Sequence, residues 1–150
     1  MKVVCLLVSA VFVASFSAGC SGSSPNPTSP SSAGNSLDLM ASQLPGTWEL
    51  VSIQPAGEAE QARPSGASYI VTFADGRLST RADCNLCGGS YTLNGQTLVA
   101  GPLLACTRAA CATMAFESVY TRLLAGESTV SLTDGTLVLT SPRGVLRFTR

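Results

Sequence analysis

From residue 44 onward, apolar and polar residues alternate in short segments that end at turn-forming dipeptides. Alternation with a period of two is typical of strands that bury one face. Asp-Gly and Asn-Gly accept the positive φ of tight hairpin turns, and they occur at 75–76, 94–95 and 134–135. Successive hairpins make an antiparallel meander. The strands that this pattern predicts are 46–53, 69–73, 77–83, 91–93, 97–99, 129–133, 136–141 and 145–149.

One segment has a helical period instead. Five apolar residues follow the spacing i, i+3, i+4, i+7, i+8, which predicts one apolar helix face: Phe116, Val119, Tyr120, Leu123 and Leu124. Thr113 suits the N-cap of this helix and Gly126 its C-terminal end. Glu117 and Arg122 lie off the apolar face, so we expect both side chains to point outward. The pattern as a whole predicts a mainly β fold: an antiparallel, partly open barrel of about eight strands, with one packed α-helix that covers its core.

The N-terminus has a different pattern. Lys2 precedes an almost unbroken apolar run over 3–16, which is too short to span a bilayer comfortably and predicts a cleavable signal peptide over 1–19. The segment 16–20 resembles a bacterial lipobox, in which the cysteine, here Cys20, is lipidated and becomes the new N-terminus. The alternative is an ordinary secretory signal in which Cys20 has no role.

Residues 20–43 are expected to form the lipidated cysteine and a tether. Residues 21–36 consist almost wholly of small, polar and proline residues, which cannot bury enough apolar surface to fold. Ser21 follows the cysteine where aspartate would retain a lipoprotein in the inner membrane. By resemblance to known sorting rules, this favours an outer-membrane lipoprotein on the periplasmic or cell-surface side. The membrane is then a partner through the lipid anchor.

Charge and composition exclude several functions. Nine basic residues balance nine acidic ones and no basic stripe is present, so we expect no nucleic-acid partner. The chain has no histidine, which removes the Ser-His-Asp and Cys-His arrangements and every histidine metal site. The carboxylates are scattered and form no evident acid/base pair. We therefore expect no enzyme, no catalytic residue, no cofactor and no metal.

Four cysteines lie close together in the sequence, as Cys84-x2-Cys87 and Cys106-x4-Cys111. Thiolates at these spacings are compatible with a zinc site, and Cys-x-x-Cys also occurs in redox proteins. A redox motif would open a helix in a βαβ unit, whereas Cys87 is followed by two glycines. Export favours two disulfides. Four cysteines allow three connectivities.

Several residues in this order resemble the META domain family, also called HslJ-like, over roughly 44–148: Gly46-Thr47-Trp48, Phe73, Gly76-Arg77-Leu78-Ser79, Cys84-Asn85, Gly89-Ser90-Tyr91, Thr107, Cys111, Phe116-Glu117, Tyr120, Leu123, Gly135-Thr136-Leu137, Leu146 and Phe148. The resemblance implies a META/HslJ-like domain over 44–150, with a small β-rich fold and no accepted catalytic residues. Such domains are common on exported proteins and lipoproteins, and some relatives are linked to heat or antibiotic tolerance. Thr80 departs from the family, which often has glycine there.

The resemblance also bears on the disulfides. In the family, the positions of Cys84 and Cys111 are often cysteines without the other two. This implies a Cys84–Cys111 disulfide and leaves Cys87 to pair with Cys106.

The segment Gly46-Thr47-Trp48 is also similar to the first strand of lipocalins, in which an arginine of the last strand packs over the indole. Arg147 is the expected partner in a structural pair with Trp48; alternatively, Trp48 only closes the base of the barrel. The expected function is that of a non-enzymatic, membrane-anchored META-domain lipoprotein of the cell envelope. It would bind an envelope protein partner or support stress tolerance. The alternative is a lipocalin-like carrier of a small apolar ligand, which would need a ligand-sized cavity inside the barrel.

Overall fold

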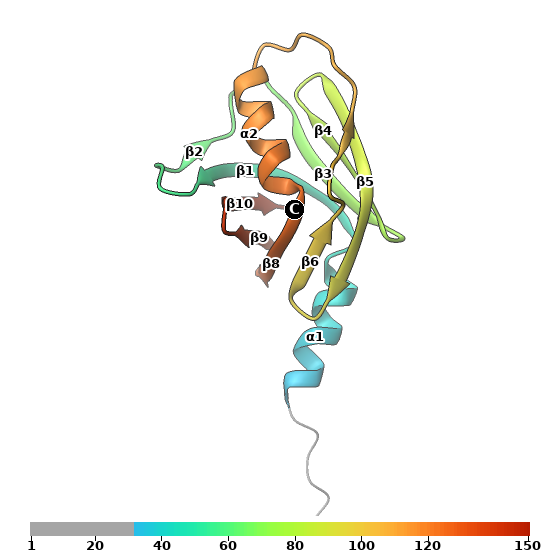
Figure 1. The fold of residues 1–150 in the computed structure, drawn as a ribbon. Coiled ribbons are helices and arrows are strands. Elements are labelled where there is room, and N and C mark those ends of the chain that lie inside the picture. The colour runs from blue at the N-terminus through green and yellow to red at the C-terminus, as the bar shows by residue number, and fades with distance from the viewer. Residues whose placement is uncertain (1–31) are drawn as a thin grey trace, which may run out of the picture.

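The computed structural model describes residues 32–150, with side chains from Asp38 onward; the predicted signal peptide and Cys20 lie outside the described residues. Two helices and ten strands follow one another (Figure 1). Their bounds are α1 Ser32–Gln43, β1 Gly46–Pro55, β2 Gln61–Ala62, β3 Tyr69–Ala74, β4 Arg77–Ala82, β5 Asn85–Asn94, β6 Thr97–Ala100, β7 Ala105–Cys106, α2 Met114–Leu124, β8 Gly126–Thr133, β9 Thr136–Ser141 and β10 Gly144–Thr149.

Eight of the strands form a closed antiparallel barrel in the order β1-β3-β4-β5-β6-β8-β9-β10, and β10 pairs with β1 to complete the ring. The predicted fold class is therefore confirmed, and the ring is complete where the sequence suggested a partly open one. Closure is possible because β1 is long and has a register shift between Leu50 and Ser52. Its first residues pair with β3 and its later ones with β10.

Gly144 begins β10 at the point where the ring closes. It has φ +143, and a Cβ atom there would collide with the backbone of Gln54 and Pro55. Only glycine lets the two strands approach so closely at this position. The three predicted hairpin turns also form as expected, with positive φ at Asp75 (48°) and Asp134 (48°) and at the glycine of each dipeptide.

Large side chains fill the barrel interior. The bulkiest of the fully buried residues are Trp48, Tyr69, Tyr120, Phe73 and Phe148. Burial of a large apolar side chain stabilises a fold by about 1.5–3 kcal/mol. Within the described part of the chain, the core residues lie between residues 44 and 148. These residues form one continuous core, and we expect residues 32–150 to fold without the preceding residues.

Helix α2 packs against the barrel with contacts to β1, β4 and β10 (Figure 1). Tyr120, Leu123 and Leu124 of the predicted apolar face are buried, and Phe116 and Val119 are half-buried against the same core. The predicted helix face is confirmed. The predicted ends also agree with the structure, since Thr113 takes the N-cap position and Gly126, with φ +84, follows the C-cap residue Ala125.

Helix α1 occupies the last twelve residues of the segment that the sequence predicts as a tether. The sequence explains this difference: residues 37, 40, 41 and 44 are Leu, Met, Ala and Leu at helical spacing, and neither glycine nor proline occurs from 35 to 44. The helix leads into one end of the barrel (Figure 1), where the indole nitrogen of Trp48 donates a hydrogen bond to the carbonyl of Leu44 (2.9 Å). Neither described helix is long and apolar enough to cross a membrane.

The arginine over Trp48 is Arg150, so the predicted partner Arg147 is wrong. The guanidinium carbon of Arg150 lies 4.2 Å from the Trp48 ring centroid. Arg147 instead forms an ion pair with Glu60 (3.2 Å), because alternation along β10 points Leu146 and Phe148 inward and the residue between them outward. Arg150 also donates hydrogen bonds to the carbonyls of Gln43 (2.5 Å) and Pro45 (2.7 Å). It therefore holds the end of α1 against the indole.

Thr80 and Tyr120 join β4 to α2 inside the core. Both side chains are buried, and their hydroxyl oxygens are 2.7 Å apart. Thr80 donates to the carbonyl of Ile70 (2.8 Å), so the Tyr120 hydroxyl donates to Thr80. Burial raises the pKa of Tyr120 above its ordinary value. The threonine, where relatives often have glycine, thus provides the acceptor that a buried phenol needs.

Substitutions at this pair test its contribution to stability. Thr80→Val leaves the Tyr120 hydroxyl buried without its acceptor and should cost about 1–3 kcal/mol. Tyr120→Phe removes the same hydrogen bond. In urea denaturation, the double variant should be little less stable than Thr80→Val alone, because the unpartnered hydroxyl is gone. Strictly additive losses would show that the two hydroxyls do not interact.

Candidate functional site

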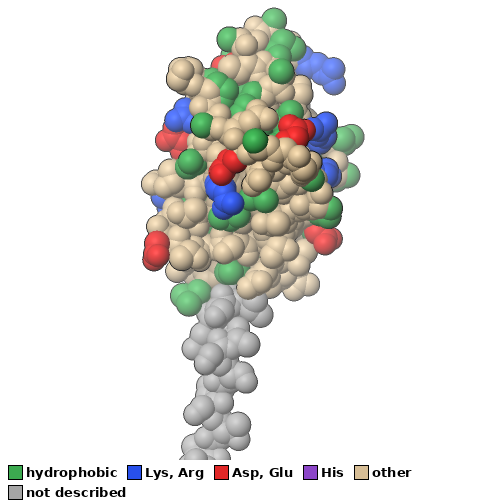
Figure 2. All heavy atoms as spheres, turned by 90° about the vertical axis from the view of Figure 1, so that its left-hand side faces the viewer, with side chains coloured by type: hydrophobic (Ala, Val, Ile, Leu, Met, Phe, Trp, Pro, Cys, Tyr) green, Lys and Arg blue, Asp and Glu red, His purple; other side chains and the backbone are tan. Residues whose placement is uncertain are grey.

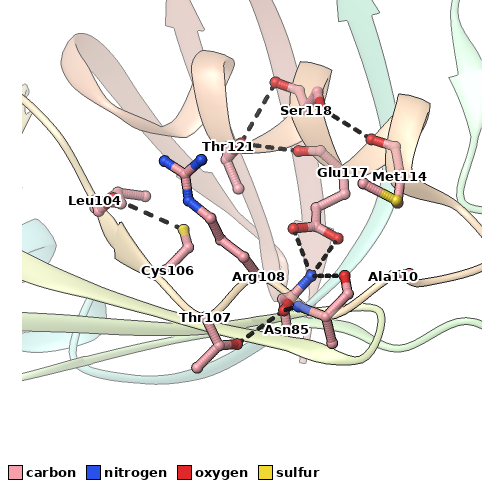
Figure 3. Close-up of a pocket in the computed structure, with 11 residues that line it drawn as sticks. Asn85, Leu104, Cys106, Thr107, Arg108, Ala110, Met114, Glu117, Ser118 and Thr121 are labelled. Carbon is pink, nitrogen blue, oxygen red and sulfur yellow. Dashed lines mark hydrogen bonds between the residues drawn. The ribbon is translucent and has the colours of Figure 1, made fainter.

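A recess opens on the surface between α2 and the segment 102–113. Its volume is about 420 Å³, and it is lined by Asn85, Leu104, Cys106, Thr107, Arg108, Ala109, Ala110, Met114, Glu117, Ser118 and Thr121. Figure 3 shows the Arg108 side chain reaching across the recess toward Thr121, with Asn85 and Glu117 at its base. The recess lies outside the filled barrel, so the segment 102–113 and the exposed side of α2 create it.

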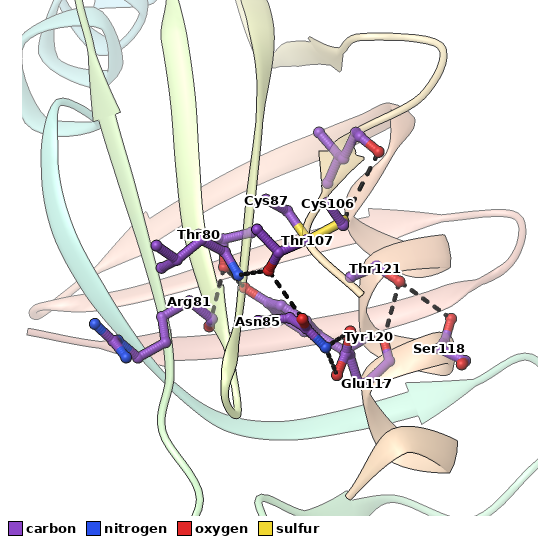
Figure 4. Close-up of a disulfide and its surroundings, with 12 residues drawn as sticks. Thr80, Arg81, Asn85, Cys87, Cys106, Thr107, Glu117, Ser118, Tyr120 and Thr121 are labelled. Carbon is purple, nitrogen blue, oxygen red and sulfur yellow. Dashed lines mark hydrogen bonds between the residues drawn. A yellow bond between two sulfur atoms is a disulfide. The ribbon is translucent and has the colours of Figure 1, made fainter. Parts of the chain in front are cut away.

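Two disulfides hold the segment 102–113 in place. Cys84 is bonded to Cys111, and Cys87 is bonded to Cys106 (Figure 4), which is the pairing that the family resemblance implies. Cys87 and Cys106 also face each other directly across β5 and β7. The sequence separations of 27 and 19 residues correspond to about 3–4 kcal/mol per bridge in the chain-entropy model. Residues 107–110 are exposed and have no core of their own, so their position depends on these bonds.

Asn85 links the segment to the barrel, and the sequence analysis did not identify this role. The side chain is only 2% exposed. Its Oδ1 accepts hydrogen bonds from the Thr107 hydroxyl and the Ala109 amide, both at 2.8 Å. Its Nδ2 donates to the carbonyl of Ala109 (3.1 Å) and to the carboxylate of Glu117 (3.0 Å). One side chain thus satisfies groups from both walls of the recess.

The expectation that the Glu117 side chain points outward is wrong. The residue is half-buried, and both carboxylate oxygens lie within 3.1 Å of Nδ2 of Asn85. The helical period placed Glu117 off the apolar face correctly. It did not show that Asn85, at the start of β5, reaches this side of α2.

A second carboxylate fixes the start of α2. Asp83, with φ +56, accepts hydrogen bonds from the amide (3.0 Å) and the hydroxyl (2.7 Å) of Thr113. The hydroxyl of Tyr69 in turn donates to Thr113 Oγ1 (2.7 Å). Burial raises the pKa of Tyr69, and the carboxylates of Asp83 and Glu117 add to this effect. Thr113 therefore uses its hydroxyl to attach α2 to the barrel and makes no side-chain cap bond.

The groups that line the first recess are suited to recognition of a partner. The carboxylates of Asp83 and Glu117 are engaged in structural hydrogen bonds, and the four cysteines of the described residues are in disulfides. Among the residues from 32 onward, no group of three or more potential ligands could hold a metal ion. The recess is lined by hydroxyl groups, the guanidinium of Arg108 and apolar side chains that include Leu104 and Met114.

A second recess, of about 310 Å³, adjoins the first. It is lined by Pro102, Leu103, Leu104, Cys106, Thr121, Arg122, Ala125 and Arg143, and it shares Leu104, Cys106 and Thr121 with its neighbour. The connection from β7 to α2, which borders the first recess, lies at the end of the domain opposite α1 (Figure 1). On the face that Figure 2 shows, several hydrophobic side chains and a basic one lie at that end, and acidic and basic side chains are mixed across the middle.

The Asn85 network predicts which of these residues matter for stability. Asn85→Ala should cost about 2–4 kcal/mol, because it leaves several buried polar groups without partners. Glu117→Ala should cost about 1–2 kcal/mol, more than an exposed residue would. The exposed Gln96 offers a control, and Gln96→Ala should stay within about 0.5 kcal/mol. Denaturation of the oxidised protein measures all three; a neutral Glu117→Ala would contradict the network.

Two NMR structures are among the solved structures similar to this chain. An NMR structure of a protein from Burkholderia xenovorans has a TM-score of 0.62 and 26% identity, over 75% of this chain and 86% of that one. A second NMR structure has a TM-score of 0.57 and 21% identity, over 73% of this chain and 92% of that one, and shows the same fold. A search of curated proteins found no match.

The sequence also matches a family model. The model is that of the META domain, and the match covers residues 41–150, which include the barrel, α2, both disulfides and the two recesses. The chain belongs to the META domain family.

Proposed function

We propose that this protein is a non-enzymatic, lipid-anchored META-domain protein of the cell envelope that binds a partner at the α2 recesses and thereby supports stress tolerance. One observation carries the proposal. The barrel interior is filled by core side chains, whereas the two adjoining recesses beside α2 are bordered by a segment that two disulfides and Asn85 hold in place. A surface recess whose walls are held in place, on a barrel with a filled interior, suits binding of a partner rather than catalysis.

The anchor is supported by the N-terminal sequence and by the arrangement of the domain. The signal-like run ends in the lipobox-like Cys20. Helix α1 enters the domain at the end opposite the connection from β7 to α2 (Figure 1). An acylated N-terminus would therefore not cover the first recess. The two disulfides are in keeping with an oxidising compartment.

The filled interior also bears on the lipocalin-like alternative. A carrier needs a cavity within the barrel, whereas Trp48, Phe73 and Phe148 occupy that space and the described recesses open on the outer surface. The packing therefore favours binding at the surface.

The lipid anchor is testable by mass spectrometry of the membrane fraction. The mature protein should begin at Cys20 and carry acyl chains on that residue. Cys20→Ala should abolish the acylated form. Cys5→Ala, within the predicted signal peptide, is the matched control and should leave acylation unchanged. A soluble mature protein with another N-terminus would exclude the anchor.

Complementation tests the function. A strain that lacks the gene should lose tolerance to envelope stress, and the wild-type chain should restore it. Ser118→Trp, which fills the first recess from α2, should fail to restore tolerance although the protein folds. Ala115→Trp is the control, because Ala115 is exposed on the same helix and does not line the recess. Full restoration by a folded Ser118→Trp protein, or the absence of any stress defect in the deletion strain, would refute the proposal.

A further inference from the structure

Three arginines gather around the two recesses beside α2. Arg122 and Arg143 line the second recess and Arg108 lines the first, and all three are exposed. Arg143 donates a hydrogen bond to the backbone carbonyl of Ala125 at the end of α2. The recesses share Leu104, Cys106 and Thr121, so the three side chains border one continuous surface.

These arginines have no carboxylate partner within the described part of the chain. The ion pairs found among residues 38–150 are Arg63–Glu49 and Arg147–Glu60, and none involves the three arginines. Of the residues that line the two recesses, one is acidic: Glu117, in the first recess. Asn85 already donates to its carboxylate. Like charges around a common surface repel one another. An anionic partner would remove this repulsion.

The same surface carries an exposed apolar residue. Leu103 is 84% exposed, more than any other large hydrophobic residue of the described chain, and it lies between Pro102 and the half-buried Leu104. The partner should therefore offer an apolar region as well as negative charge. A bilayer with anionic headgroups has both, at adjacent depths.

We propose that the surface formed by Leu103, Arg108, Arg122 and Arg143 docks on anionic phospholipid headgroups, with Leu103 inserted among the acyl chains and the guanidinium groups on the phosphates. This inference deepens the proposed function by naming a membrane lipid as a partner of the same site. Guanidinium groups bind phosphate oxygens through paired hydrogen bonds. The charges are spread over two recesses and flank an apolar residue, which suits a lipid surface better than one small anion.

Without the lipid anchor, we expect this surface to bind the bilayer weakly. Each arginine near an anionic bilayer raises partitioning by about fivefold. An anchored domain would stay close to the bilayer, and the resulting effective concentration would make such a contact significant. The surface is nevertheless testable without the anchor, because residues 32–150 contain this continuous core.

The test is co-sedimentation of residues 32–150 with vesicles of phosphatidylcholine alone or mixed with phosphatidylglycerol. The wild-type domain should bind the mixed vesicles, and added salt should weaken binding. Arg108→Gln with Arg122→Gln should lower partitioning by about 30-fold. Arg77→Gln with Arg81→Gln, at exposed arginines of β4, changes the net charge equally and should have a much smaller effect. Leu103→Ser should lower partitioning by about tenfold or more, whereas Leu86→Ser at another exposed leucine should not.

Three results would overturn the inference. One is equal binding to neutral vesicles, and another is an equal loss in the two arginine pairs. The third is displacement by inorganic phosphate together with an unaffected Leu103→Ser variant, which would identify a site for free phosphate instead. None of these results depends on acylation of Cys20 or on complementation. The vesicle experiment can therefore refute the docking surface without refuting the proposed function, and complementation can refute the proposed function without refuting the docking surface.

Discussion

Strand β1 pairs with both β3 and β10 of the ring, and the rest of the barrel depends on this. It pairs with β3 through Gly46–Glu49 and with β10 from Glu49 to Pro55, with a register shift between Leu50 and Ser52. Without the second pairing, β1 and β10 would each expose a row of unpaired backbone groups. Closure also encloses the interior, so that the inward-facing side chains of all eight strands pack into one core. Gly144 makes this pairing possible, because the backbone of Gln54 and Pro55 leaves no space for a side chain there.

The closed barrel supports a site that it does not itself contain. Thr80 holds α2 on the core through a hydrogen bond with Tyr120. Asp83 holds the start of the helix through its hydrogen bonds with the N-cap residue Thr113. Asn85 and the disulfides of Cys84 and Cys87 attach the segment 102–113, which forms the opposite wall of the recess. Residues 80–87 thus position both walls of the recess. Rigid secondary structure that presents a connecting segment is a common way to build a binding site.

The sequence predicted those features that depend on neighbouring residues. The hairpin turns follow from Asp-Gly and Asn-Gly, and the α2 face follows from a helical period that packing against one core preserves. Features that depend on distant residues were missed or misplaced. Arg150 rather than Arg147 reaches Trp48, because strand alternation points the Arg147 side chain outward, whereas the guanidinium of Arg150, the residue after β10, lies over the indole. Asn85 looks like any polar residue after a turn, although the family motif Cys84-Asn85 pointed to its position. No local pattern shows that its amide meets Glu117, which lies 32 residues later.

The β1–β10 pairing has a consequence for how the chain folds. Glu49 and Thr149 are paired although they lie at opposite ends of the domain sequence, and contacts of such high sequence separation slow folding. A chain that emerges with its N-terminus first cannot close the ring until its last strand is free. Before then, hairpins such as β3–β4 and β8–β9 can form locally, but the edge of β1 stays open to other chains. The shorter loops closed by Cys84–Cys111 and Cys87–Cys106 can form earlier, since all four residues precede β8. Oxidation of the cysteines could therefore precede closure of the barrel.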